Sequence, residues 1–219
     1  MIELEDFFED VIGKTIRGTG MADGVLSFLT NVEPDAIAKL KNGEFDEVAV
    51  RAIAPALGLD ADCLVELANR DWRPESVDLE GLRQSNTVFD PDPDDMMTVN
   101  SYLIWDPQTK EAALFDTGAD ASLALDMVKN LGVDLKTLFI THSHIDHIID
   151  REKVIEAHPE IRVLVNAKEP IAGAERFAAG ETFSIGTLRV TTRLTWGHSP
   201  AGTTYVINGL SRPVAIVGD

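Results

Sequence analysis

The sequence has a single cysteine, few aromatic residues, and about half as many basic as acidic side chains. Cys63 has no second thiol to pair with, which excludes an internal disulfide and is typical of a reducing compartment. No run approaches the roughly 18 apolar residues that a membrane-spanning helix needs. The first ten residues, MIELEDFFED, are acidic where a secretory signal is basic and then apolar. We therefore expect a soluble, cytoplasmic protein with no membrane partner.

Positive charge is scarce: 19 Lys and Arg stand against 37 Asp and Glu, which gives a net charge of -18. Proteins that bind nucleic acid draw most of their non-specific affinity from cations placed against phosphates. This balance therefore argues against general affinity for nucleic acid or anionic membranes. The length of 219 residues allows one large domain or two small ones, and the 44% of hydrophobic residues is typical of a soluble globular protein. A small-molecule substrate is the expected partner.

The pattern of apolar residues changes near residue 75. Before it, short segments carry apolar residues three and four positions apart, as on one face of a helix. The segment ADCLVELANRD (61–71) shows this spacing at Leu64, Leu67 and Ala68. Cys63 lies on the same amphipathic segment, and we expect it in the core. The sequence thus predicts a small all-α domain over residues 1–75.

The rest of the chain alternates between strand and helix patterns, as α/β domains do. TLFIT (137–141) is a short apolar run typical of a strand buried on both faces, and LRVTTRLT (188–195) alternates. Between strands, ADASLALDMVKNLG (119–132) predicts a crossover helix that ends at Gly132. The polar, aperiodic stretch 76–88 is expected to be a linker, which leaves an α/β domain over residues 89–219.

Histidines are concentrated in FITHSHIDHIID (139–150), although the whole chain has only five. Residues two apart in an extended segment point the same way, so His142 and His144 can aim at one point. Asp146 and His147 follow and offer a second group of ligands. Imidazole with carboxylate suits zinc, iron or manganese. A histidine-rich surface turn is the alternative, but the concentration of these residues favours a metal site.

Four ordered pieces of residues 85–219 resemble the metallo-β-lactamase superfamily of metal-dependent hydrolases. The pieces are FDTGAD (115–120), THSHIDH (141–147), WGHSPAGTTY (196–205) and VAIVGD (214–219). The resemblance implies an α/β fold of the αββα type, in which two αβ halves pack face to face. It implies a first metal held by His142, His144 and His198, a second held by Asp146 and His147, and a bridging Asp219.

Two of these carboxylates have simpler alternatives. Asp116 in FDTGAD would orient a ligand histidine from behind, as the resemblance implies, or would only end a strand in a turn. Asp219 is the last residue of the sequence, so a frayed terminus is the alternative to its bridging role.

The motifs are most similar to those of hydroxyacylglutathione hydrolases (the second glyoxalase), lactonases and persulfide dioxygenases. This resemblance implies that a metal-bound hydroxide attacks an ester, thioester or lactone, with Asp146 or Asp219 accepting its proton. Asp146 is thus the candidate catalytic residue, and zinc the expected metal, with iron or manganese as alternatives. Two other hypotheses stay open. One is a mononuclear iron enzyme of the persulfide dioxygenase kind, using positions such as His142, His198 and Asp219. The other is a regulator that senses a metal or small ligand and acts through the helical domain.

Two features depart from the family pattern. Ile148, Ile149 and Asp150 follow the second motif where the family commonly has glycines, and Asp150 is expected to cap the next helix. The family's fold continues past its bridging aspartate and supplies one more histidine, whereas no histidine follows His198 here. We therefore expect a fold truncated at Asp219 that has two metal sites but fills one better than the other.

The stretch 24–68 resembles the five-helix helix-turn-helix domain of phage repressors, with Val32 in the turn and Ile37 and Leu40 in the third helix. Pro55 departs from that pattern, because a proline inside a helix kinks or ends it. Residues 1–75 contain 7 Lys and Arg against 16 Asp and Glu, a net charge of -9. Because such a surface repels phosphates, we interpret this domain as serving packing, homodimer formation or partner contact, and not DNA binding.

Overall fold

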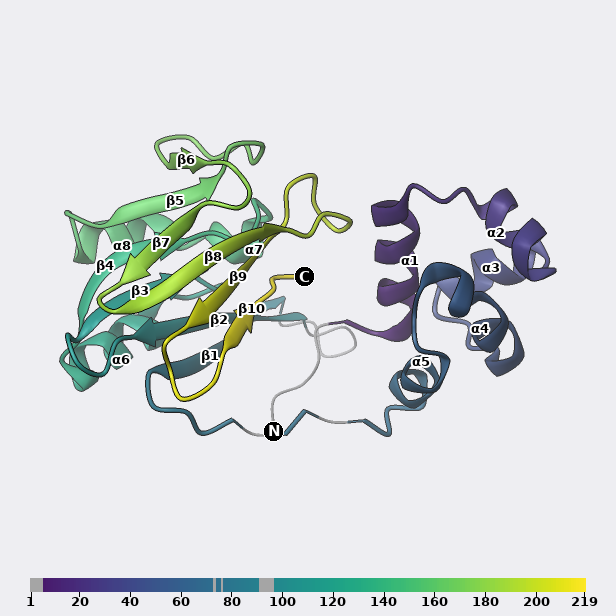
Figure 1. Cartoon of the computed structure of the whole chain (residues 1–219), viewed down its shortest axis with the longest axis horizontal. Helices are drawn as coiled ribbons and strands as arrows, with labels where there is room; N and C mark the ends of the chain where they lie inside the picture. Colours follow the sequence, from purple (N-terminus) through teal and green to yellow (C-terminus); the bar gives the residue numbers. More distant parts are fainter. Residues whose placement is uncertain (1–5, 73, 76, 91–96) are drawn as a thin grey trace. The chain divides into compact units, whose positions relative to one another are not determined.

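The chain divides into two compact units, residues 1–76 and 77–219. The computed structural model describes residues 6–72, 74–75, 77–90 and 97–219. The first unit is built of helices, and the second combines helices with two β-sheets (Figure 1). The expected fold class, an α/β domain preceded by a small all-α domain, is confirmed.

Short amphipathic helices make up the first unit, and their apolar faces form one core. The helices are α1 (Phe8–Thr19), α2 (Asp23–Thr30), α3 (Pro34–Lys41), α4 (Glu47–Ile53), the 3-10 turn η1 (Pro55–Leu57) and α5 (Ala61–Ala68). The expected effect of Pro55 is confirmed, since α4 ends at Ile53 just before it. The expectation for Cys63 is wrong: its side chain is exposed, because α5 turns Leu64 and Val65 inward instead. Within the described residues, no helix of either unit has the length and apolarity needed to cross a bilayer.

A six-stranded sheet forms one layer of the second unit. Its strands, in spatial order, are β1 (Leu82–Asp90), β2 (Met97–Trp105), β3 (Glu111–Phe115), β4 (Asp134–Phe139), β5 (Arg162–Asn166) and β6 (Glu175–Phe177). The first three strands pair antiparallel, and β3 to β6 pair parallel. The predicted crossover helix is confirmed as α6 (Ser122–Leu131), which joins β3 to β4 and ends at Gly132 with a φ of 61°. Helix α8 (Arg151–Ala157) similarly joins β4 to β5.

The central strands are buried on both faces, and successive residues enter different cores. In β4, Leu138 packs with the helices α6 and α8, whereas Phe139 packs toward the second sheet. In β5, Val163 and Leu164 divide in the same way. This alternation explains why the strand sequences are continuously apolar, as the run TLFIT predicted.

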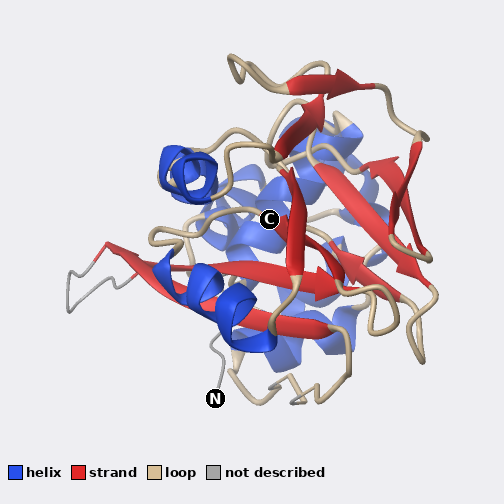
Figure 2. Cartoon of the chain, turned by 90° about the vertical axis from the view of Figure 1, so that its left-hand side faces the viewer, coloured by secondary structure: helices blue, strands red, loops and turns tan. Residues whose placement is uncertain are grey.

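The second sheet is antiparallel and lies against the face of the first sheet opposite the helices. It contains β7 (Thr182–Ile185), β8 (Leu188–Leu194), β9 (Thr203–Asn208) and β10 (Val214–Ile216), in the spatial order β10-β9-β8-β7. Tyr205 of β9 is fully buried between the sheets, where its ring contacts Phe115 and Phe139. Its hydroxyl donates a hydrogen bond to the carbonyl of Ile140 (2.6 Å). The strands and the helices of the chain can be followed in Figure 2.

The expectation of a linker over residues 76–88 is corrected for residues 82–88. These residues belong to β1, which begins at Leu82 and pairs with β2 along its length. The strand was missed because its sequence is polar, with no apolar stripe. Polar side chains instead bond across the pair: Gln84 donates to Asn100 (2.7 Å), and the hydroxyls of Ser85 and Ser101 lie 2.6 Å apart. The second unit therefore begins before residue 89.

Candidate metal centre

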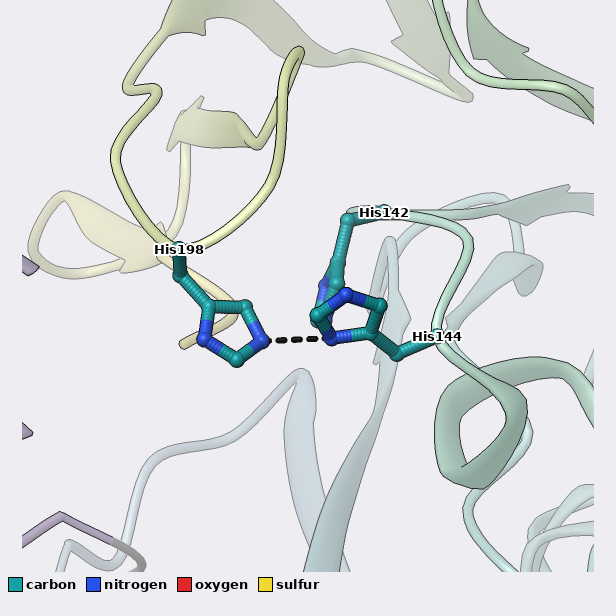
Figure 3. Close-up of side chains that lie close together, drawn as sticks. All are labelled: His142, His144 and His198. Carbon is teal, nitrogen blue, oxygen red and sulfur yellow. Dashed lines mark hydrogen bonds between the residues drawn. The ribbon is translucent and has the colours of Figure 1, made fainter. Parts of the chain in front are cut away.

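The histidine-rich segment lies where β4 ends, at the carboxyl edge of the parallel strands. His142 and His144 lie in the loop after β4, and His147 lies in the short helix α7 (Ile145–Ile148). His198 comes from the loop between β8 and β9, and Asp219 follows β10. Side chains from both sheets thus meet at one edge. Figure 3 shows the rings of His142, His144 and His198 converging.

The ligand atoms of these residues form two groups that share one histidine. The first group is His142, His144 and His198, and the second is His142, His147 and Asp219. Within each group the nitrogen or oxygen atoms lie within 4.8 Å of one another. In the first, Nε2 of His198 is 2.6 Å from Nδ1 of His144. Both sets consist of residue types that bind divalent ions, and their ligand atoms are near enough to one another to surround one ion.

Asp146, the candidate catalytic residue, belongs to neither group. Its Oδ2 atom lies 3.5 Å from Nε2 of His147, and its side chain is 19% exposed. It therefore lies at the solvent side of the second group, beside the ligands.

Asp219 belongs to the second group and also lies near the first. Its Oδ1 atom is 3.1 Å from Nε2 of His147, and its Oδ2 atom is 3.5 Å from Nε2 of His198. One carboxylate oxygen therefore faces each group, which is the arrangement that the bridging role requires.

Asp116 is linked to both groups by hydrogen bonds on the side of the rings away from the ligand nitrogens of His142 and His147. It follows β3 with a φ of 58°, a left-handed conformation that costs energy for a residue with a side chain. Its Oδ1 atom accepts a hydrogen bond from the amide of Thr141 (2.7 Å). Its Oδ2 atom accepts from the hydroxyl of Thr141 (2.7 Å) and lies 2.8 Å from Nδ1 of His147. A histidine that donates its Nδ1 proton to a carboxylate presents Nε2 to a metal.

The Thr141 hydroxyl extends this arrangement to His142. Its only proton goes to Asp116, so Nδ1 of His142, 3.0 Å away, is assigned as the donor to Thr141 Oγ1. The Nε2 atom of His142 then carries a lone pair. This atom is buried and has no hydrogen-bond partner among the described residues. A buried nitrogen lone pair without a partner is costly, so the residues fit a metal ion in this place.

The local charges favour a cation as well. Burial above all, and then the charge of His147, lower the pKa of His142 to about 3, so its imidazole is neutral as a ligand must be. Burial alone would lower the pKa of His147, but the charges of Asp116 and Asp219 outweigh it and raise that pKa to about 11. Without a metal His147 is therefore protonated, and a divalent ion bound at its Nε2 atom would displace that proton and be stabilised by the same carboxylates.

Two residues that contact the ligand loops carried no signal in the sequence. Thr141 precedes the first histidine, and its role depends on Asp116, which comes from another strand. Glu169 follows β5 and is fully buried, and it accepts hydrogen bonds from the loops of His144 and His198. Asp150 occupies the N-cap position of α8 as expected, but its side chain makes no capping hydrogen bond there and accepts from the amide of Ala121 (2.7 Å) instead.

Comparison with known proteins places the chain in a family. Residues 95–219 match Lactamase_B, the metallo-beta-lactamase superfamily, and since this is more than half of the chain, the protein belongs to that superfamily. Mouse (Mus musculus) persulfide dioxygenase ETHE1, mitochondrial, is 28% identical over 120 residues, which are 54% of this chain and 46% of that protein. Hydroxyacylglutathione hydrolase GloC of Haemophilus influenzae is 41% identical over 49 residues, which are 22% of this chain and 23% of that protein.

Among solved structures, ETHE1 from Myxococcus xanthus is 26% identical and has a TM-score of 0.48, covering 57% of this chain and 53% of that one. The chain spans about half the length, or less, of the curated relatives it matches.

Proposed function

We propose that this protein is a metal-dependent hydrolase that acts on an ester, thioester or lactone. The observation that carries the proposal is a pair of adjacent ligand groups, with His142 at their junction. Neighbouring ions in hydrolases can acidify the attacking water and polarise the carbonyl oxygen of an ester, thioester or lactone. Zinc is the metal that three imidazoles suit best.

The residues have distinct roles in this proposal. His142, His144 and His198 would hold one ion. The one free nitrogen of His142 serves that ion, so a second ion would be held by His147 and Asp219. A divalent ion bound there would acidify water and polarise a carbonyl. Asp116 keeps His147 in the orientation that leaves Nε2 for binding. Asp146 is partly exposed beside the second group, so its carboxylate can accept a proton from an entering water.

A second candidate is an iron-dependent persulfide dioxygenase. His142, His198 and Asp219 provide two imidazoles and one carboxylate, the set typical of non-haem iron oxygenases. The 28% identity to mouse persulfide dioxygenase over 54% of this chain also supports it. The hydrolase is favoured because one iron at those three residues would leave the buried His147–Asp116 pair without a ligand role.

Metal analysis and two assays on the purified protein separate these candidates. Zinc, with cleavage of a thioester, ester or lactone in a small panel, would support the hydrolase. A single iron, with oxygen consumed in the presence of a persulfide, would support the dioxygenase instead. Protein that binds neither metal on reconstitution would contradict both proposals.

A further inference from the structure

Glu169 is a fully buried carboxylate whose oxygens are divided between two loops. It lies in the turn after β5, and its side-chain neighbours come from other parts of the chain. Its Oε2 atom accepts from the amide (3.1 Å) and the hydroxyl (2.5 Å) of Ser143. Its Oε1 atom accepts from the hydroxyl of Ser199 (3.1 Å) and the amide of Ala201 (3.0 Å). All four donors are neutral groups, and together they compensate for the water that the carboxylate loses.

The two loops that Glu169 joins carry the first ligand group. Ser143 lies between His142 and His144, and Ser199 directly follows His198. The first loop leaves the six-stranded sheet, and the second connects two strands of the four-stranded sheet. Neither sheet alone can therefore determine how far His144 lies from His198. A main-chain bond from Thr203 to Thr141 (3.0 Å) joins the loops at their base.

We propose that Glu169 is a positioning residue that sets the separation of His144 and His198, and so the geometry of the first ligand group. This inference rests on the proposed metal site. Ser143 precedes His144, and Ser199 follows His198. Both serines donate hydrogen bonds to the carboxylate of Glu169, which is rigid and planar. The carboxylate therefore acts as a spacer of fixed length between the loops.

A Glu169→Gln variant tests this role with little change in size. An amide has one acceptor oxygen and one NH2 group, and that NH2 group can only donate. The NH2 group of the glutamine would face one of the two loops. There it would meet the backbone N–H of Ser143 or of Ala201, which is also a donor, so at least one hydrogen bond to that loop would be lost. Supporting groups of this kind typically contribute 10- to 100-fold to metal affinity. We expect the first ligand group of the variant to bind metal about 10- to 100-fold more weakly.

Asp106 provides a matched control in the same unit. It is buried, and it too accepts four hydrogen bonds from neutral donors: the amide of Gln108 (2.9 Å), the hydroxyl of Thr109 (3.0 Å), and the amide (2.7 Å) and hydroxyl (2.9 Å) of Thr187. These donors lie in the turn after β2 and the turn between β7 and β8, which carry no candidate ligand. An Asp106→Asn variant thus removes a comparable buried carboxylate away from the candidate metal centre.

The experiment is a titration of the full chain and both variants with Co²⁺, followed by the visible absorption spectrum and by competition with a chelator. Urea unfolding of each apo-protein is measured in parallel. We expect Glu169→Gln to weaken binding and to change the cobalt spectrum, which reports coordination geometry. Asp106→Asn should lower stability but leave both cobalt readouts as in the wild type.

The outcomes separate this inference from the proposed function. Wild-type protein that binds no cobalt would contradict the metal site itself. Cobalt binding by the wild type, with the same affinity and spectrum in a folded Glu169→Gln variant, would overturn the positioning role alone. If that variant does not fold, Ser143→Ala and Ser199→Ala each remove one hydroxyl bond to Glu169. A few-fold weaker binding with a shifted spectrum would support the role, and unchanged readouts in both would overturn it.

Discussion

His198 and His144 lie with Nε2 and Nδ1 2.6 Å apart, although 54 positions separate them in the sequence and their loops belong to different sheets. Ligand nitrogens about 2.0–2.1 Å from a tetrahedral zinc ion lie roughly 3.4 Å from each other. The two rings therefore have to separate only slightly to bind one ion. The candidate site is close to a geometry that would hold a metal ion, through contacts of the protein alone.

Replacing His142 and His144 together by alanine should abolish binding in the first group. His142 also belongs to the second group, so we expect the metal content of the double variant to fall to near zero. Mass-spectrometric metal analysis of purified protein measures this. His158→Ala is the control, because His158 follows α8 and belongs to neither group. Equal metal content in the double variant and the wild type would disprove the site.

Asp116→Asn should weaken the second group more than the first. The amide keeps the shape of the side chain, but it is neutral and has only one acceptor oxygen. It therefore cannot replace both carboxylate oxygens, which accept hydrogen bonds from Thr141 and His147. We expect about 10- to 100-fold lower affinity for the second equivalent of metal, measured by chelator competition.

Asp120→Asn serves as the comparison for that variant. Asp120 lies four positions further on, and its exposed carboxylate bonds to Lys153 and Ser122. The same affinity in both variants would show that Asp116 does not orient the ligands.

Asp106→Asn should reduce the free energy of unfolding in a pH-dependent way. Burial alone would raise the pKa of Asp106, but hydrogen bonds from Thr187, Gln108 and Thr109 outweigh it and lower the pKa to about 2. Because the folded-state pKa is depressed, the ionised side chain stabilises the fold fully above pH 4, and this contribution is lost as the pH falls toward 2. We expect the variant to be less stable by about 1–2 kcal/mol at pH 7.

Urea unfolding of both proteins at pH 7 and pH 3 measures this difference. The gap between the wild type and the Asp106→Asn variant should narrow at pH 3. A gap that stays constant or widens there would rule out this account of Asp106.

The helical unit should not bind DNA specifically at physiological salt. Helix α3 begins at Pro34 with Glu33 before it and Asp35 in its first turn, and its Lys41 is already paired with Asp23 (2.7 Å). Fluorescence anisotropy with random and selected duplexes should show no defined site with sub-micromolar affinity. A Glu33→Lys, Asp35→Lys variant should gain weak, salt-sensitive binding, since binding of this kind follows local charge. A defined site bound by the wild type would favour the regulator hypothesis.

Local features of this protein could be predicted from the sequence because backbone geometry alone determines them. Two-residue spacing beyond a strand brings His142 and His144 to one side, and helical spacing defines α5 and α6. The missing N–H of Pro55 ends α4 wherever that helix lies. The position of Asp116 at a strand end could likewise be read from FDTGAD.

Other features depend on which distant segments meet, and only the tertiary structure decided them. The polar segment β1 forms a strand because its side chains and backbone pair with those of β2. Cys63 is exposed because Leu64 and Val65, its neighbours in α5, fill the core. The role of Glu169 exists only where loops of two sheets meet around one carboxylate. The spacing of apolar residues along a segment indicates the backbone structure of that segment. The hydrogen-bond partners of a side chain depend instead on how the two sheets pack together.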